Sequence, residues 1–561
     1  MKQFCSILLV LTGMFSLHAQ QPELVKNIRP GSNGSLPYYE NGMISYNDHL
    51  LFAADDGVSG MELWISDGTE TGTMLLKDIN PGAAGSECQN FFRVGEKVIF
   101  QAKTTAEGQE LWVTDGTAAG TTLLKDIRPG TGDGVWITVA VNDYYYVWND
   151  VLYFSANDGQ VGLELWRTDG TESGTWLLKD IQTIFGANGN GNPRYFGELG
   201  DKLYFTGYEN SSDGEQLWVT DGTTAGTKRF HTFPGVTGGV NPRHKLAVNG
   251  RLVFYAEGND MGPELWATDG TPAGTLLVKD INPAPNTGSD DTQPNTHEHR
   301  LNRIGNTIYF GANDGTNGRE LWRTDGTPAG TWMVKDGSAK TPGYVPQLFT
   351  VMDDILYYKY DNGENGIELW RSDGTEAGTW MVKDATPGSQ GSFWLPSFLT
   401  AINGRIYFGG AKGSAFNVEL WTSDGTEAGT MVLPDINPSS GDGSDPNRFT
   451  LVGDEVLFGA RTATQGMELW KIKASSVSTS DPVLEGVSLF PTMTTGSFTL
   501  QGDDQGGYDL RVLDLQGRWI AAWSNQPAGR SYDLASAAPG MYLVQISREG
   551  HSALVKLVLE H

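Results

Sequence analysis

Residues 164–176, ELWRTDGTESGTW, decide the fold of this 561-residue chain, because close copies of them recur along its length. Further copies open at Glu110 (ELWVTDGTAAGT), Glu264 (ELWATDGTPAGT) and Glu368 (ELWRSDGTEAGT). The tryptophan of this motif marks nine units spaced about 50 residues apart, at Trp64, Trp112, Trp166, Trp218, Trp266, Trp322, Trp370, Trp421 and Trp470. A chain this long exceeds one ordinary core, and the period indicates a repeat architecture.

Each unit contains four short runs typical of β-strands. In the last unit they are residues 449–453, 455–460 and 467–472, and the usual fourth run is exemplified by residues 177–181. Apolar and β-branched residues fill the runs, and Gly, Asp and Asn separate them. Units of four strands at this period predict an all-β chain, a β-propeller of about nine blades (8 to 9). A solenoid is the alternative.

The two ends of the repeat region favour a closed ring. The ninth unit stops at ELWKIK (468–473) without a fourth strand, whereas LVKNI (24–28) supplies a spare copy of that strand near the N-terminus. Pairing of the two would remove both open sheet edges. The sequence therefore predicts a propeller over residues 20–473 that is closed by its N-terminal strand.

The repeated residues are interpreted as structural. The tryptophans are expected to fill the space between blades, and each aspartate begins an Asp-Gly hairpin turn. These aspartates are Asp67, Asp115, Asp169, Asp221, Asp269, Asp325, Asp373 and Asp424. The glutamate recurs eight times and is replaced by Gln216 in the fourth unit. A catalytic acid is needed once, so this repetition argues against acid–base chemistry by these carboxylates.

The pattern resembles that of the ELWxxDGTxxGT-repeat proteins, a family of exported bacterial repeat proteins, over about residues 24–473. The hairpins also resemble the structural Asp-box hairpins of sialidase-type propellers. The family resemblance implies a secreted or surface protein of the propeller kind. It implies no known reaction or substrate.

The N-terminus and the composition bear on location and partners. Residues 1–19 have the pattern of a secretory signal peptide, with Lys2, an apolar run at 6–15 and a small-residue exit at Ala19. Loss of Cys5 with this segment leaves Cys88 alone, so no internal disulfide is expected. No later apolar run is long enough for a membrane span. The net charge of −28 argues against nucleic acid as a partner.

Residues 474–482 read as a Ser-rich linker, and residues 483–561 as a small β-sandwich. This last segment resembles the C-terminal sorting domain of type IX secretion. The resemblance is carried by Phe490-Pro491, Leu513-Asp514-Leu515-Gln516-Gly517-Arg518, Pro539-Gly540-Met541-Tyr542 and Lys556-Leu557-Val558. Thr492-Met493 stand where the family usually has Asn-Pro. The resemblance implies export through the type IX machinery, with the tail removed or used for surface attachment.

A ligand site is sought where the units differ, near the mouth of the channel. Nine residues before the second-strand motif, every unit has a polar residue: Asn41, Gln89, Asp143, Arg194, Arg243, His299, Gln347, Ser397 and Asn447. The assignment of Asp143 is complicated by the irregular run YYYVWND (144–150). We expect Arg194, Arg243, His299, Gln347 and Asn447 to bind ligand, with the two arginines clamping an acidic polysaccharide. Polar residues that are simply solvated at a channel mouth are the alternative.

Metal sites and catalysis leave weaker signals in the sequence. Asp- and Asn-rich loops at 54–57, 156–159, 361–366 and 441–447 make calcium the candidate cofactor, with plain polar turns as the alternative. His297 and His299 are a candidate metal pair without an identified third ligand. No local enzyme motif is found. The sequence therefore predicts a binding or adhesion module, and the alternatives are a carbohydrate-active lyase or glycosidase with a top-face site, or a surface-layer component.

Overall fold

The computed structural model describes residues 21–474 and 487–559 apart from short stretches. The stretches left out are 38–41, 136–140, 185–188, 211, 231–232, 234–238, 259–260, 284–300, 338–345, 389–390, 394–397, 414–416, 439–440, 491–492, 495–496, 503–506, 515–518, 535–536, 538–539 and 549–550. The predicted signal peptide, most of the linker, and Asn41, His297, His299 and Ser397 therefore lie outside the described residues. The chain divides into two compact units, residues 1–474 and 475–561.

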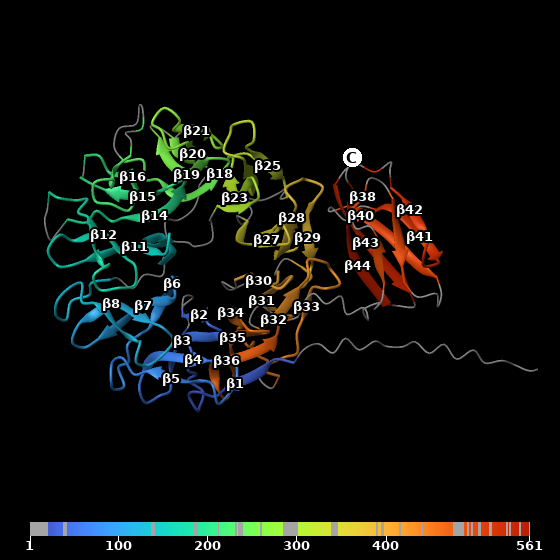
Figure 1. Cartoon of the computed structure of the whole chain (residues 1–561). Coiled ribbons are helices and arrows are strands. Elements are labelled where there is room, and N and C mark those ends of the chain that lie inside the picture. The colour runs from blue at the N-terminus through green and yellow to red at the C-terminus, as the bar shows by residue number, and fades with distance from the viewer. Residues whose placement is uncertain are drawn as a thin grey trace, which may run out of the picture. The chain divides into compact units, whose positions relative to one another are not determined.

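The described residues of the first unit form nine antiparallel four-stranded sheets, which we call blades 1 to 9 (Figure 1). Blade 1 comprises β2 (Met43–Tyr46), β3 (His49–Asp55), β4 (Met61–Ser66) and β5 (Met74–Lys77). Blade 2 comprises β6 (Gln89–Val94), β7 (Lys97–Thr104), β8 (Gly108–Thr114) and β9 (Thr122–Lys125). Blade 3 comprises β10 (Tyr145–Trp148), β11 (Val151–Asn157), β12 (Leu163–Thr168) and β13 (Trp176–Lys179), and the helix α1 (Val141–Tyr144) precedes it.

Blades 4 to 6 follow the same order along the chain. Blade 4 comprises β14 (Arg194–Leu199), β15 (Lys202–Tyr208), β16 (Glu215–Thr220) and β17 (Lys228–Arg229). Blade 5 comprises β18 (Arg243–Val248), β19 (Arg251–Gly258), β20 (Met261–Thr268) and β21 (Leu276–Lys279). Blade 6 comprises β22 (Asn302–Ile304), β23 (Thr307–Asn313), β24 (Arg319–Thr324) and β25 (Trp332–Lys335).

Blade 9 differs from the others because its outermost strand comes from the N-terminus. Blade 7 comprises β26 (Gln347–Met352), β27 (Ile355–Asp361), β28 (Ile367–Ser372) and β29 (Thr379–Lys383). Blade 8 comprises β30 (Thr400–Ile402), β31 (Arg405–Ala411), β32 (Val418–Ser423) and β33 (Met431–Val432). Blade 9 comprises β34 (Asn447–Val452), β35 (Glu455–Thr462), β36 (Gly466–Lys473) and β1 (Glu23–Lys26).

The nine blades form one closed ring. The inner strands of successive blades contact one another from blade 1 round to blade 8, β31 of blade 8 contacts β34 of blade 9, and β34 contacts β2 of blade 1 (Figure 1). Strand β1 pairs antiparallel with β36, and Leu24 lies opposite Trp470. The predicted propeller, with nine blades and closure by the N-terminal strand, is confirmed.

The core lies between neighbouring blades. The second strand of each blade is buried on both faces, as in β3, where the consecutive residues Leu50, Leu51 and Phe52 are fully buried. The motif tryptophans are buried except Trp112, which is half-buried. Trp64 of blade 1 packs in one cluster with Leu457 of blade 9. Burial of such large side chains between sheets supplies the main favourable term in the folding of this ring.

The motif glutamate ties the third strand to the segment that leaves the blade. The buried Glu62 accepts hydrogen bonds from the backbone N–H groups of Ile79 at 2.8 Å and Asn80 at 3.0 Å, and from the Ser86 hydroxyl at 2.6 Å. Burial raises the pKa of this carboxyl above its usual value. The repeated carboxylate therefore satisfies backbone donors that would otherwise be buried without partners.

The remaining motif residues build the turn between the third and fourth strands. Asp67 Oδ1 accepts hydrogen bonds from the backbone N–H and the hydroxyl of Thr69, at 2.8 and 2.7 Å. The Thr69 hydroxyl accepts from the N–H of Gly72 at 2.9 Å. A Cβ on Gly72 would overlap the Asp67 carboxylate, so only glycine fits there. The hydroxyls of Ser66 and Thr73 meet at 2.7 Å beneath the turn.

The second unit, described by itself, is a small β-sandwich. Its three-stranded sheet contains β37 (Ser488–Phe490), β39 (Ser497–Gln501) and β42 (Ser531–Asp533). Its five-stranded sheet contains β38 (Met493–Thr494), β44 (His551–Leu559), β43 (Gly540–Arg548), β40 (Tyr508–Asp514) and β41 (Trp519–Gln526). Leu489 and Phe498 of the first sheet share one buried core with Leu510 and Val544 of the second. The predicted C-terminal sandwich is confirmed.

Candidate functional site

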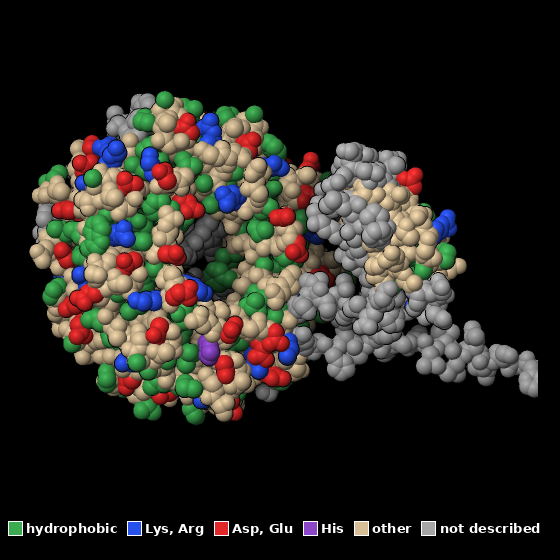
Figure 2. Space-filling model, in the orientation of Figure 1, with side chains coloured by type: hydrophobic (Ala, Val, Ile, Leu, Met, Phe, Trp, Pro, Cys, Tyr) green, Lys and Arg blue, Asp and Glu red, His purple; other side chains and the backbone are tan. Residues whose placement is uncertain are grey.

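Four of the five predicted ligand-binding residues lie at equivalent places in the ring. Arg194, Arg243, Gln347 and Asn447 are the first residues of the inner strands β14, β18, β26 and β34. His299 lies outside the described residues. The space-filling view shows the hollow at the centre of the ring toward which these inner strands face (Figure 2).

The residue after each of these positions adopts a left-handed backbone conformation. Its φ is 54° at Tyr195, 49° at His244, 52° at Leu348 and 59° at Arg448, and Asn90 in β6 behaves alike with 59°. Each lies within an irregularity in the pairing with the second strand, a β-bulge. Bulges redirect side chains and are enriched beside functional sites. Non-glycine residues in this conformation also carry strain.

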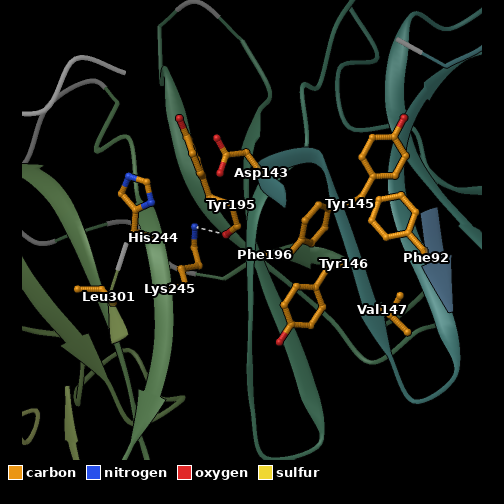
Figure 3. Close-up of a pocket in the computed structure, with 10 residues that line it drawn as sticks. All are labelled: Phe92, Asp143, Tyr145, Tyr146, Val147, Tyr195, Phe196, His244, Lys245 and Leu301. Atoms are coloured by element: carbon orange, nitrogen blue, oxygen red, sulfur yellow. Dashed lines mark hydrogen bonds between the residues drawn. The ribbon is translucent and has the colours of Figure 1, made fainter. Parts of the chain in front are cut away.

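A cavity of about 310 Å³ lies against two of these bulges (Figure 3). Aromatic rings from three successive blades form much of its wall: Phe92 of β6, Tyr145 and Tyr146 of β10, and Tyr195 and Phe196 of β14. Its remaining lining residues are Asp143, Val147, His244, Lys245 and Leu301. Aromatic walls with a few convergent polar groups are typical of small-ligand sites.

The cavity adjoins the blade that departs from the repeat. Asp143 was expected at the start of an inner strand, and this placement is wrong: it lies in α1, ahead of β10. The helix contacts β14 of the next blade. It brings Asp143 to the cavity wall, where the carboxylate lies beside the ring of Tyr195 (Figure 3). The irregular run YYYVW supplies Tyr145, Tyr146 and Val147 to the same wall.

The two predicted arginine clamps are both paired with glutamates. Arg194 Nη2 lies 2.6 Å from Glu215 Oε1. Arg243 Nη2 lies 3.0 Å from Glu257 Oε1, and the Arg243 side chain is only 8% exposed. A guanidinium already matched by a carboxylate offers little net charge to an anionic ligand. Neither arginine is among the residues that line the cavity.

Lys245 forms part of the cavity wall but is fully engaged. Its Nζ donates hydrogen bonds to the carbonyl oxygens of Tyr195 at 2.8 Å and Pro242 at 2.7 Å, and to the Thr206 hydroxyl at 2.8 Å. Burial lowers the pKa of this ammonium group, and the charge of Glu215 opposes that shift. The three N–H donors are thereby used, so Lys245 joins β18 to β14 instead of reaching a ligand.

Tyr195 and His244 provide the polar rim between the two blades. Their ring centroids are 5.5 Å apart. The Arg194 guanidinium lies 5.1 Å from the Tyr195 ring centroid. Burial raises the pKa of the Tyr195 phenol to about 12, with Asp143 among the further contributors. The phenol is therefore protonated at neutral pH and suited to hydrogen bonding, not to proton abstraction.

Gln347 and Asn447 are not among the lining residues of the cavity. Asn447 Nδ2 donates to the Asp445 carbonyl at 2.9 Å, and its Oδ1 accepts from Arg448 Nε at 2.7 Å. Gln347 pairs in register with Lys359. The structure thus brings Arg194 and Arg243 close to the cavity and leaves Gln347 and Asn447 in blades 7 and 9.

The Asp-rich loops form hydrogen-bonded turns. Asp56 Oδ1, for example, accepts from the N–H groups of Val58 at 2.8 Å and Ser59 at 2.7 Å, and Arg29 pairs with Asp55. Within the described ranges, no group of three or more His, Cys, Asp or Glu side chains is arranged to hold a metal ion. In the described part of the chain, no helix has the length and apolar character needed to cross a membrane.

Sequence reasoning missed the aromatic wall and the bulge residues. Tyr195 directly follows Arg194, and His244 directly follows Arg243, the two arginines that the sequence predicts to bind ligand. The signal that could have found Tyr195 and His244 is the aromatic run at 144–148, which breaks the repeat. Most of the cavity comes from the blade that follows the pattern least and from its two neighbours.

Comparison with known proteins identifies the tail. Residues 488–560 match the family model of the secretion system C-terminal sorting domain, which confirms that resemblance. The domain marks the chain as a secreted or cell-surface protein and implies interaction with the type IX secretion machinery. No curated protein matches the chain.

Solved structures with related arrangements are distant. A crystal structure of puromycin hydrolase is 13% identical with a TM-score of 0.35, covering 67% of this chain and 58% of that chain. A Mycobacterium tuberculosis puromycin-hydrolyzing peptidase is 11% identical with a TM-score of 0.37, covering 67% and 58%. A prolyl endopeptidase structure is 11% identical with a TM-score of 0.37, covering 67% and 54%. The chain spans under two thirds of the length of each.

Proposed function

We propose that this protein is a secreted binding propeller of the ELWxxDGTxxGT-repeat kind, whose channel cavity holds a saccharide and thereby serves adhesion or glycan recognition. The observation that carries this proposal is the aromatic-walled cavity of about 310 Å³ beside blade 3. The cavity lies where the repeat is interrupted. The repeated motif residues, in contrast, make structural contacts within and between blades.

The chemistry of the wall fits a sugar ring. The electron-rich face of the half-buried Tyr146 attracts the partly positive C–H groups of a pyranose face. Asp143 and His244 stand among the aromatic rings of the wall and provide polar atoms for hydroxyl groups. A volume of about 310 Å³ accommodates one or two sugar residues at the low end of ligand-site sizes.

The charge balance favours a neutral sugar over an acidic one. Arg194 and Arg243 are matched by Glu215 and Glu257, and Asp143 contributes a carboxylate to the wall. The whole chain carries a net charge of −28. An acidic ligand would approach against this field, and neither Arg194 nor Arg243 has an unmatched guanidinium to receive it.

The test is calorimetric titration of the full chain with glucose, galactose, mannose, N-acetylglucosamine and glucuronate. We expect at least one neutral sugar to bind. His244→Ala and Tyr146→Ala should each weaken that binding about tenfold through loss of a polar or stacking contact. Leu348→Ala is the matched control, because Leu348 holds the same bulge position in blade 7 and does not line the cavity.

Three results would count against the proposal. The first is that none of the sugars binds. The second is preferential binding of glucuronate that is abolished by Arg194→Ala with Arg243→Ala, which would restore the acidic-ligand hypothesis. The third is release of new reducing ends when oligosaccharides of the bound sugar are incubated with the protein, which would favour the alternative of a carbohydrate-active enzyme.

A further inference from the structure

A second candidate binding surface lies on the outer edge of the ring, away from the channel. Trp332 begins β25 of blade 6 and Trp380 lies in β29 of blade 7, and both belong to outermost strands. Their side chains are 43% and 44% exposed, whereas the motif tryptophans Trp322 and Trp370 of the same blades are buried. Aromatic side chains are enriched at binding surfaces, which makes a pair of exposed indoles on neighbouring blades a candidate for one.

Both indoles are held in place from one side. Trp332 lies opposite Arg323 in the pairing of β24 with β25, and the guanidinium carbon is 4.5 Å from its ring centroid. Trp380 lies opposite Arg371 in the same way, at 4.7 Å. Such stacking fixes the ring and occupies one face, so the exposed surface is pre-organised.

The two pairs are also fixed relative to each other. Arg323 Nη1 donates to the Gly374 carbonyl of blade 7 at 3.1 Å. Lys335 Nζ donates to the carbonyl of Thr379, the residue before Trp380, at 2.7 Å. Neighbouring blades therefore present two parallel copies of one aromatic platform.

We propose that Trp332 and Trp380 form a binding surface for a neutral polysaccharide chain that crosses blades 6 and 7. A polymer of repeating sugar rings matches a platform that is itself repeated, and each ring places a C–H face on an indole. The net charge of −28 of the chain disfavours a polyanion as the ligand.

A protein partner fits this surface less well. Within the described parts of β25 and β29, each strand exposes a single large hydrophobic side chain, the indole. Stable protein interfaces bury a contiguous core of about 800 Å² per partner. Two separated rings on polar strands offer stacking contacts without such a core.

Blade 3 supplies a control with a single indole of this kind, which is half-buried. Trp176 lies opposite Arg167, with the guanidinium carbon 5.5 Å from its ring centroid. The equivalent residue of the next blade is Lys228, so the Trp176 platform has no aromatic neighbour there. If polysaccharide binding requires two adjacent indoles, Trp176 should not contribute to it.

The experiment is affinity electrophoresis of the full chain in gels that contain soluble xylan, β-glucan or galactomannan, with polygalacturonate as the charged comparison. We expect retardation in a neutral polymer, and about tenfold weaker retardation for Trp332→Ala with Trp380→Ala. Trp176→Ala should migrate like the parent protein. Unchanged thermal unfolding of the double variant would show that the loss does not arise from misfolding.

Several outcomes would overturn the inference. These are no retardation of the parent protein in any neutral polymer, retardation that the double variant retains, an equal loss with Trp176→Ala, or retardation in polygalacturonate alone. The result is separable from the channel site, since monosaccharide titration of the double variant should give the parent affinity. If that titration fails while polymer retention persists and depends on both indoles, the outer surface stands without the channel proposal.

Discussion

The carboxylate of Glu468 accepts a hydrogen bond at 3.0 Å from the backbone N–H of Ile28, 440 residues earlier in the chain. The same carboxylate accepts from the N–H of Arg29 at 3.2 Å and the hydroxyl of Ser35 at 2.6 Å. In blade 1 the equivalent contacts join Glu62 to residues only 17 and 18 positions away. One repeated contact therefore serves blade architecture in most blades and ring closure in blade 9.

Glu468→Ala should loosen the closure of the ring. It leaves the donors of Ile28, Arg29 and Ser35 without an acceptor in a buried place, at a cost of about 2–4 kcal/mol. We expect a lower midpoint of urea unfolding and faster proteolytic cleavage near β1. Glu62→Ala, the control, should lower the midpoint but leave the N-terminal strand protected. Equal cleavage near β1 in both variants would contradict this role for Glu468.

Stability should fall as the pH rises from about 5 to 8. Burial raises the pKa of Glu110 to about 8 and those of Glu164, Glu368 and Glu419 to about 7. At a pH below the pKa of the unfolded chain, these glutamates are protonated in both the folded and the unfolded protein. Between that pKa and the higher pKa of the folded protein, only the folded protein keeps the protons. The contribution is thus present in acid and lost on the way to pH 8. Melting temperatures measured across this range provide the check.

Glu110→Gln should flatten that pH dependence. The substitution removes one titrating group, and Gln216 shows that an amide is accommodated at the equivalent position of blade 4, where its Nε2 donates to the Asp213 carbonyl at 2.6 Å. A neutral amide resembles the protonated carboxyl, so the parent and variant melting temperatures should run closest at about pH 5 and diverge toward pH 8, where the parent alone loses stability by ionising Glu110. Parallel curves would mean that Glu110 does not titrate in this range.

Gly72→Ala should destabilise blade 1 by about 2–3 kcal/mol, because the added methyl group overlaps the Asp67 carboxylate and forces the turn to shift. Thr71→Ala is the control, since Thr71 is exposed in the same turn. Chemical unfolding of both variants separates the steric effect from a general sensitivity of the turn. A similar midpoint for the two would argue against close packing of Gly72.

Arg194 and Glu215 should show a coupling free energy of about 1–3 kcal/mol in a double-mutant cycle. Their ion pair at 2.6 Å is mostly shielded, with side chains 20% and 19% exposed. Either single alanine substitution leaves a partly buried charge without its partner, and the double substitution removes both. Additive effects on the unfolding midpoint would show that the two charges act independently.

The ring was predictable because its signals are repeated and local. Each unit repeats the same strand pattern, turn motif and tryptophan. A wrong strand assignment in one unit is therefore corrected by comparison with the others. The closure by residues 24–28 followed from counting strands, and β1 lies at Glu23–Lys26. The predicted site was harder to derive from the sequence. The ion pair of Arg194 with Glu215 joins β14 and β16, and the sequence does not specify the register of these two strands.

The cavity could not be predicted for a related physical reason. Asp143 and the tyrosines after it do not follow the repeat pattern. The period of the strands therefore does not predict where their side chains point. The left-handed conformations of Tyr195 and His244 depend on bulges that tertiary contacts select. Alignment by period therefore led to Arg194 and Arg243, one residue before the side chains that reach the cavity.

Blade 9 is completed by the N-terminal strand β1, so the order in which the strands are synthesised affects the assembly of the ring. Strand β1 is synthesised more than 400 residues before its partner β36. Blades 1 to 8 can each form from a continuous stretch, whereas the last sheet waits for both ends, a contact of very high sequence separation. A circular permutant that moves residues 21–37 to follow residue 474 would make every blade local, and its refolding should be faster than that of the natural order.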